Sequence, residues 1–137
     1  MTDQEALRNQ LHAMMEKSAR ALRAAKEHIT KGDADFASSK AYYSVFHLMQ
    51  AALLTKGKTY SKHAGVISGF SEEFIKTGIF ARDYGEAIQR LRKDRELGDY
   101  GYQLSVSFEE ATKDVKAAEE IGTSILKYLH TFISQRK

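Results

Sequence analysis

The most continuous apolar stretch of the chain spans positions 41–55, where His47 is the only side chain that can carry a charge near neutral pH. Its apolar positions are spread around the helix that the stretch predicts, and such a helix needs partners on most sides. Ser44, His47 and Gln50 interrupt it too often for a bilayer span, which needs about 20 mostly apolar residues. We therefore expect segment 33–57 to form the central helix of a bundle rather than to enter a membrane.

Two longer segments repeat apolar residues at steps of three and four, which predicts amphipathic helices packed against the central one. The seam of the first comprises Leu7, Leu11, Met14, Ser18, Leu22, Ala25 and Ile29. Gly32 then predicts a stop and Asp33 an N-cap, so the central helix should run back antiparallel. Ser107 and Glu110 predict a capping box for the last helix. Its seam comprises Phe108, Ala111, Val115, Ala118, Gly122, Ile125, Leu129 and Phe132, and we expect it to pack lengthwise on the first helix.

Two shorter helices are expected between the long ones. The third helix should be capped by Ser61, end at Gly78 and bury an inner face of Val66, Ile67, Phe70 and Phe74. Gly65 and Gly69 have two possible explanations. Either they allow another group to approach this helix closely, or the helix merely tolerates them. The fourth helix should begin near Phe80, with an inner face of Tyr84, Ile88 and Leu91 that continues into Arg95. Gly98 and Gly101 should then loosen the chain. The pattern predicts an all-α, up-and-down bundle of four to five helices in a single domain, residues 1–137.

Composition narrows the choice of chemistry. The chain contains no cysteine or proline, which excludes disulfides and thiolate zinc sites. Its N-terminus lacks the apolar region of a secretory signal, so we expect a cytoplasmic protein. Phosphate-binding glycine loops and common hydrolase motifs are absent, and the five histidines show no i, i+4 pair, so we expect no metal or other cofactor. We expect His47 to be a core histidine rather than a ligand.

Segment 89–102 carries the clearest functional signal. Arg90, Arg92, Lys93 and Arg95 lie close in sequence to three tyrosines, Tyr84, Tyr100 and Tyr102. Arginines contact phosphates and tyrosines stack on bases, as single-stranded nucleic acid or a nucleotide requires. The alternative is a solvated helix face on which Arg95 pairs with Asp99 one turn on. Similarly, Lys62 and His63 near a helix N-terminus could hold an anion, or belong to a short packing helix.

Three segments resemble the HEPN family of small all-helical domains, in particular its UPF0332 branch: AYYSVFHLMQAALL at 41–54, SKHAGVISGF at 61–70 and LRKDRELGDYGY at 91–102. The resemblance implies a homodimer formed through the active-site face. It also implies the functions of many HEPN proteins, which are metal-independent ribonucleases of toxin–antitoxin and defence systems and are often encoded beside a minimal nucleotidyltransferase. Their signature is an arginine, then a histidine, and in one toxin group a tyrosine that accepts AMP. Arg95 and Tyr102 match the first and last positions, but Tyr100 stands where the histidine is expected.

This substitution leaves several hypotheses open, because a tyrosine of pKa near 10 is a poor proton-transfer group at neutral pH. The first is a module that binds RNA or a nucleotide through Arg92, Arg95, Asp99 and Tyr102, with Lys62 and His63 as further binding residues. The second is an atypical metal-independent ribonuclease with Arg95 and Tyr100 as catalytic residues, assisted by His63. The third is a non-catalytic partner of a minimal nucleotidyltransferase with Tyr102 as AMP acceptor. A bundle whose basic patch has no specific role is the fourth.

Overall fold

The computed structural model describes residues 2–102 and 105–136, and most of these are helical. The elements in chain order are α1 (Asp3–Thr30), α2 (Ala34–Leu54), α3 (His63–Phe70), a short π-helix η1 (Ser71–Ile75), α4 (Asp83–Tyr100) and α5 (Phe108–Ser134). These residues include no strand. The predicted all-α helical bundle is therefore confirmed.

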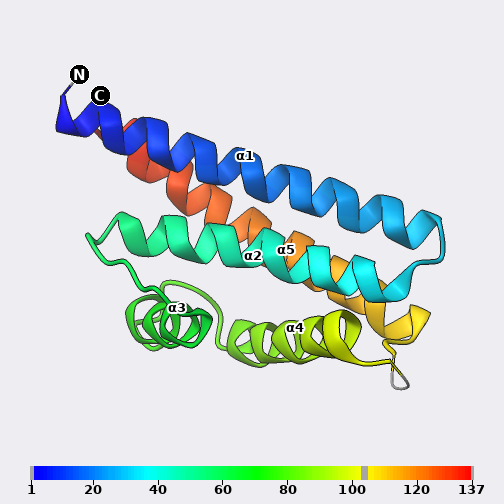
Figure 1. The fold of residues 1–137 in the computed structure, drawn as a ribbon. Helices are drawn as coiled ribbons and strands as arrows, with labels where there is room; N and C mark the ends of the chain where they lie inside the picture. Colours follow the sequence, from blue (N-terminus) through cyan, green and yellow to red (C-terminus); the bar gives the residue numbers. More distant parts are fainter. Residues whose placement is uncertain (1, 103–104, 137) are drawn as a thin grey trace.

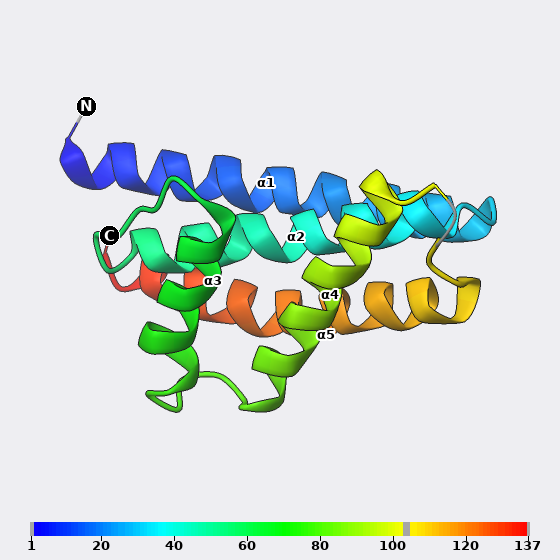
Figure 2. The ribbon, with the colours of Figure 1, turned by 60° about the horizontal axis from the view of Figure 1, so that its bottom comes forward.

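The three long helices α1, α2 and α5 lie side by side, and α3 and α4 pack on one side of α2 (Figure 1). α2 runs antiparallel to α1, and the two chain ends lie at the same end of the bundle (Figures 1 and 2). The short helix α3 lies crosswise and is seen end-on in Figure 1. Within the described ranges, no helix is long and apolar enough to cross a membrane.

α2 is the central helix, as its apolar pattern predicts. Of its 21 residues, 13 are buried, whereas only four of the 28 residues of α1 are. α2 contacts α1, α3, α4 and α5. The expectation that α5 packs chiefly on α1 is wrong, because α5 contacts both helices but packs more extensively on α2. A helix that is apolar on most sides offers α5 more surface than the single stripe of α1 does.

Several helix ends follow the sequence signals. Gly32 takes a positive φ of 77° directly after α1, and Asp33 precedes α2, although its side chain forms no capping hydrogen bond. Ser107 is the N-cap of α5, as predicted: the Glu110 backbone N–H donates to Ser107 Oγ at 3.0 Å. The Glu110 carboxylate accepts at 3.0 Å from the Ser107 hydroxyl, where a capping box would have it accept from the Ser107 backbone N–H. Phe108, however, which was assigned to the inner seam of α5, is exposed. As the first residue of α5, it lies at the edge of the bundle.

The starts of the two short helices differ from the predictions. The N-cap residue of α3 is Lys62 rather than Ser61, and α4 begins at Asp83 rather than near Phe80. Phe80 instead packs in an aromatic cluster with Phe70, Phe74 and Tyr128. Burial of this ring fixes the chain before α4.

Two glycine sites allow a close approach of neighbouring groups. The Tyr60 ring lies over Gly65 and Gly69, where a Cβ atom at Gly69 would be 2.7 Å from the ring. The expectation that Gly98 loosens the chain is wrong, because α4 continues through it to Tyr100. A Cβ atom at Gly98 would lie 2.7 Å from the Asp35 carbonyl oxygen, so this glycine lets α4 cross close to the start of α2.

Candidate functional site

Arg95 on α4 is the centre of the candidate site. The residue is only 8% exposed, and its guanidinium carbon lies 5.1 Å from the Tyr42 ring centroid and 5.6 Å from that of Tyr43. Such cation–π contacts hold a guanidinium in place without using its N–H donors. The Asp99 carboxylate is 3.7 Å from Nη1, which is an ion pair but too long for a hydrogen bond. No hydrogen bond to the Arg95 side chain occurs within residues 2–102 and 105–136, and its Nε is buried and unpartnered.

His63, the first residue of α3, completes this cluster. Its Nδ1 is 2.8 Å from the Tyr42 hydroxyl, and its ring stacks on Phe46 with 4.1 Å between centroids. Burial lowers the pKa of His63 below its ordinary value of 6.5, and the positive charges of Arg95 and Arg92 lower it further. Burial also raises the pKa of Tyr42 to about 12, against the opposing effect of both arginines. A neutral imidazole and a protonated phenol therefore lie beside a guanidinium at neutral pH.

The structure brings together four of the residues proposed from sequence: Arg92, Arg95, Asp99 and His63. Arg92 is near enough to lower the pKa values of His63 and Tyr42, and its Nε lies 3.5 Å from Glu96 Oε1. We call Tyr42, Tyr43, His63, Arg92 and Arg95 the Arg95 cluster.

The other three proposed residues lie on exposed surface. Tyr100 is 70% exposed at the end of α4, and Tyr102 is fully exposed just beyond it. Lys62 is exposed at the start of α3. The catalytic role of Tyr100 stays a prediction, and its exposure contrasts with the burial of Arg95.

Sequence reasoning missed the aromatic part of the site. Tyr42, Tyr43 and Phe46 were assigned to the central helix only because of their apolar character. The available signal was the presence of two adjacent hydroxyl-bearing rings on a helix with few polar groups, since a buried tyrosine hydroxyl usually has a hydrogen-bond partner.

A second polar cluster links α4 to α5. Asp94 is 2% exposed and lies close to the fully buried Asp114, while its own Oδ2 is buried and has no hydrogen-bond partner among the described residues. Asp114 accepts hydrogen bonds from Ser38 Oγ at 2.9 Å and from Arg90 Nε at 3.1 Å. Burial raises the pKa of Asp94 to about 7, and the neighbouring carboxylates of Asp114 and Glu110 contribute. Sequence patterning did not identify this pair, because each aspartate lies on a helix rich in exposed charges.

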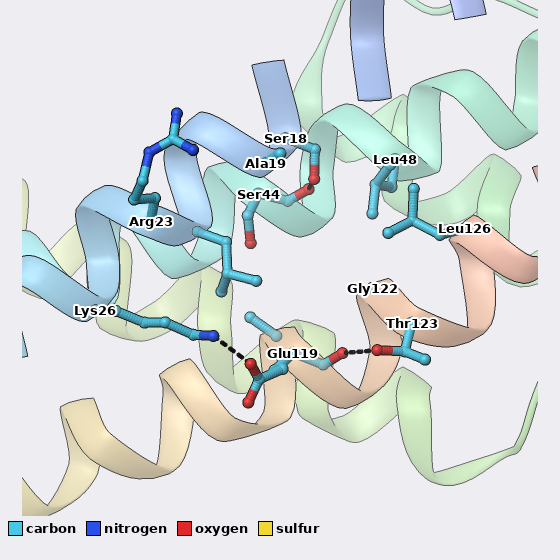
Figure 3. Close-up of a pocket in the computed structure, with 12 residues that line it drawn as sticks. Ser18, Ala19, Arg23, Lys26, Ser44, Leu48, Glu119, Gly122, Thr123 and Leu126 are labelled. Atoms are coloured by element: carbon cyan, nitrogen blue, oxygen red, sulfur yellow. Dashed lines mark hydrogen bonds and ion pairs between the residues drawn. The ribbon is translucent and has the colours of Figure 1, made fainter. Parts of the chain in front are cut away.

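A groove between α1 and α5, floored by α2, has a volume of about 350 Å³ (Figure 3). At its mouth Lys26 reaches across and forms an ion pair with Glu119. Inside, Ser18 Oγ donates a hydrogen bond of 2.6 Å to the Ser44 carbonyl. Two polar pairs thus connect walls of the groove: Lys26 with Glu119, and Ser18 with the Ser44 carbonyl.

Comparison with known proteins assigns the fold to a family. The model of the HEPN domain matches residues 11–128, and the chain therefore belongs to the HEPN family. A UPF0332 protein of Thermotoga maritima is 38% identical over 94 residues, which cover 68% of this chain and 70% of that protein. Two proteins of Methanocaldococcus jannaschii, both named "putative toxin", are also similar. One is 35% identical over 76% of this chain and 71% of its own length, and the other is 32% identical over 96% and 89%. The resemblance inferred from the sequence is confirmed.

Proposed function

We propose that this chain is a toxin-like HEPN protein that binds RNA through the Arg95 cluster. The observation that carries the proposal is Arg95 itself, which lies nearly buried against two tyrosine rings while its donors form no hydrogen bond within the described residues. A guanidinium matches the geometry of a phosphate, and aromatic rings stack on bases. Membership of the HEPN family and the names of the two relatives support the toxin-like class.

His63 supports a second proposal, metal-independent cleavage of the bound RNA. Because burial lowers its pKa below 6.5, the ring is mostly neutral at pH 7 and can accept the proton of a ribose 2′-hydroxyl as that oxygen bonds to the adjacent phosphorus. The P–O5′ bond then breaks, and the leaving 5′ oxygen takes a proton from water. Arg95 would stabilise the negative charge that develops on the phosphate. In this proposal His63 supplies the proton transfer that the family signature assigns to the position of Tyr100.

The exposure of Tyr102 favours a third proposal, in which a minimal nucleotidyltransferase modifies this chain with AMP. The side chain is fully exposed, so its hydroxyl is open to a second enzyme. Mass spectrometry after co-expression with a nucleotidyltransferase encoded beside it would show an added AMP on Tyr102. A stable complex in which Tyr102 is unmodified would contradict the acceptor role.

RNA binding is tested by fluorescence anisotropy with a labelled single-stranded RNA. We expect Arg95→Ala to weaken binding about tenfold or more, because it removes charge-assisted hydrogen bonds to a phosphate. Arg95→Lys keeps the charge but loses the planar donor set, so an intermediate loss is expected. Lys113→Ala, which removes an exposed charge from α5, is the control. Unchanged binding by a folded Arg95→Ala variant would refute the proposal.

The same variants separate binding from cleavage. The wild type, Arg95→Ala, His63→Ala and Tyr100→His are incubated with mixed RNAs in EDTA. Cleavage by the wild type that His63→Ala abolishes would support the second proposal. Cleavage by Tyr100→His alone would show a binding site that has lost the usual catalytic group, and it would contradict a catalytic role for His63.

A further inference from the structure

A basic groove between α1 and α2 adjoins the Arg95 cluster. It has a volume of about 470 Å³, and its polar lining consists of Lys17 and Arg20 from α1 together with Lys40, Tyr43 and His47 from α2. The remaining lining residues are two alanines of α1, so the groove is lined by no acidic side chain of residues 2–102 and 105–136. We call it the α1–α2 groove.

Within the part of the chain that the structure describes, the three cations of this groove are unpaired. Lys17, Arg20 and Lys40 are exposed, and none forms an ion pair or a side-chain hydrogen bond with another residue in the described part of the chain. Burial lowers the pKa of His47, and the positive charge of Lys17, which lines the same groove, lowers it further. The α1–α5 groove differs, because there Lys26 is neutralised by Glu119 (Figure 3). The α1–α2 groove therefore offers an uncompensated positive field to an anion.

Tyr43 connects this groove to the Arg95 cluster. Its ring lies 5.6 Å from the Arg95 guanidinium and 6.2 Å from the His47 ring, at an interplanar angle of 30°. Lys40, Tyr43 and His47 follow one another at steps of three and four, which places them on one stripe of α2. One stripe thus carries a cation and two aromatic rings, and it connects Arg95 to the cations of α1.

We infer that the α1–α2 groove binds the continuation of a single-stranded RNA whose phosphate is held at Arg95. Lys17, Arg20 and Lys40 contact successive phosphates, and Tyr43 and His47 provide surfaces for bases. Unpaired bases can stack on such rings, whereas bases within a duplex cannot reach them. This inference rests on the proposed function, and it adds that the ligand is a strand of several nucleotides rather than a single nucleotide.

The test compares a single-stranded RNA of about twelve nucleotides with a dinucleotide, each measured by equilibrium binding over a range of salt concentrations. The groove variant is Lys17→Ala with Arg20→Ala. Its matched control is Lys113→Ala with Lys116→Ala, which removes two exposed cations at the same spacing from α5. Arg95→Ala is measured in parallel.

We expect the groove variant to bind the longer RNA about tenfold more weakly and the dinucleotide within about twofold of the wild type. The slope of log affinity against log salt should fall by about 1.4, since each phosphate contact on a single strand contributes about 0.7. Tyr43→Leu should weaken binding of the longer RNA with little change in this slope, because stacking releases no counterions.

The inference is overturned if the groove variant binds the longer RNA as the wild type does. If Arg95→Ala then still loses both ligands, the proposed function stands without the groove. The inference is also overturned if the groove variant binds both ligands more weakly by the same factor. The groove cations would then attract any anion through their charge rather than contact the extra phosphates of the longer RNA. If Arg95→Ala binds both ligands with wild-type affinity while the groove variant no longer binds the longer RNA, the proposed function is wrong and the groove alone is the RNA site. Tighter binding of a duplex of equal length would overturn the single-stranded class.

Discussion

Asp94 and Arg95 are consecutive residues of α4, and both are buried, with 2% and 8% of their surface exposed. Asp94 lies beside Asp114, which accepts hydrogen bonds from Ser38 and Arg90, and its own Oδ2 is buried without a partner among the described residues. Arg95 lies against tyrosine rings, and its donors form no hydrogen bond within the described ranges. Two adjacent charges are thus accommodated in opposite ways.

The difference follows from what each group can do when it is buried. An aspartate avoids much of the cost of burial by holding a proton, and the pKa of Asp94 rises to about 7 accordingly. A guanidinium cannot lose its proton in a protein, so Arg95 keeps its charge. A buried charge with unused donors is costly to the fold. A bound phosphate that accepts hydrogen bonds from these donors would explain why the fold bears this cost. On this interpretation the polar cluster between α4 and α5 is structural and the Arg95 cluster is functional.

The largest expected effect on stability is that of Asp114→Ala. The substitution removes the acceptor of Ser38 and Arg90 and the neighbour of Asp94. We expect a loss of roughly 3 kcal/mol in the free energy of unfolding, at the lower end for a broken buried pair, because the Arg90 side chain is 34% exposed and can turn to water. Urea denaturation measures the loss, and Asp114→Asn, which keeps the shape, should lose less. If the folded Asp114→Ala variant also bound RNA much more weakly, the assignment of a purely structural role to the Asp94–Asp114 pair would be wrong.

The dependence of stability on pH should report on Asp94. Its pKa is raised from 3.8 to about 7 in the folded protein, so between these values the native state holds a proton that the unfolded chain has released. Stability contributed by this group therefore falls as pH rises through that interval, by up to about 1.4 kcal/mol per pH unit, and is constant above it. Asp94→Asn should remove this slope. Urea denaturation at a series of pH values measures the free energy of unfolding of both proteins. If the two curves against pH were parallel, the pKa of Asp94 would not be raised in the folded protein.

Gly98→Ala tests the crossing that places the end of α4. The added Cβ atom would lie 2.7 Å from the Asp35 carbonyl oxygen, and overpacking of this kind costs about 1–3 kcal/mol. Better helix propensity offsets about 1 kcal/mol of that. Gly85→Ala in the same helix is the control, because its Cβ atom would meet only Ile75 Cδ1 at 4.0 Å. Thermal unfolding should show a loss for Gly98→Ala and a gain for Gly85→Ala, and equal changes would contradict the close approach.

The sequence was sufficient for the bundle because the period of its apolar residues reports directly on helices, and the charge-free run of α2 identifies the central one. Local chemistry also predicted Ser107 as the N-cap of α5. The crossing at Gly98 was not predictable, since glycine is a weak helix former in isolation and its partner Asp35 is distant in the chain. For the same reason the proximity of His63 to Tyr42, which lies 21 positions earlier, needed the folded structure. Arg95 was found because its charge interrupts an apolar stripe.

Tyr42→Phe should have the smallest effect on stability and RNA binding. It separates the contribution of the Tyr42 ring to the position of Arg95 from that of the Tyr42 hydroxyl. The substitution keeps the ring that contacts the guanidinium but removes the hydroxyl 2.8 Å from His63 Nδ1. We expect a loss of about 1 kcal/mol in stability, as for a single hydrogen bond, and RNA affinity within about threefold of the wild type, since Arg95 keeps its place. Tyr43→Phe is the matched control, because its hydroxyl forms no hydrogen bond in the described residues, and it should be nearly neutral. If Tyr42→Phe instead abolished binding as Arg95→Ala is expected to, the hydroxyl itself would contact the ligand, and the neutral pair of Tyr42 and His63 would belong to the binding surface rather than to its support.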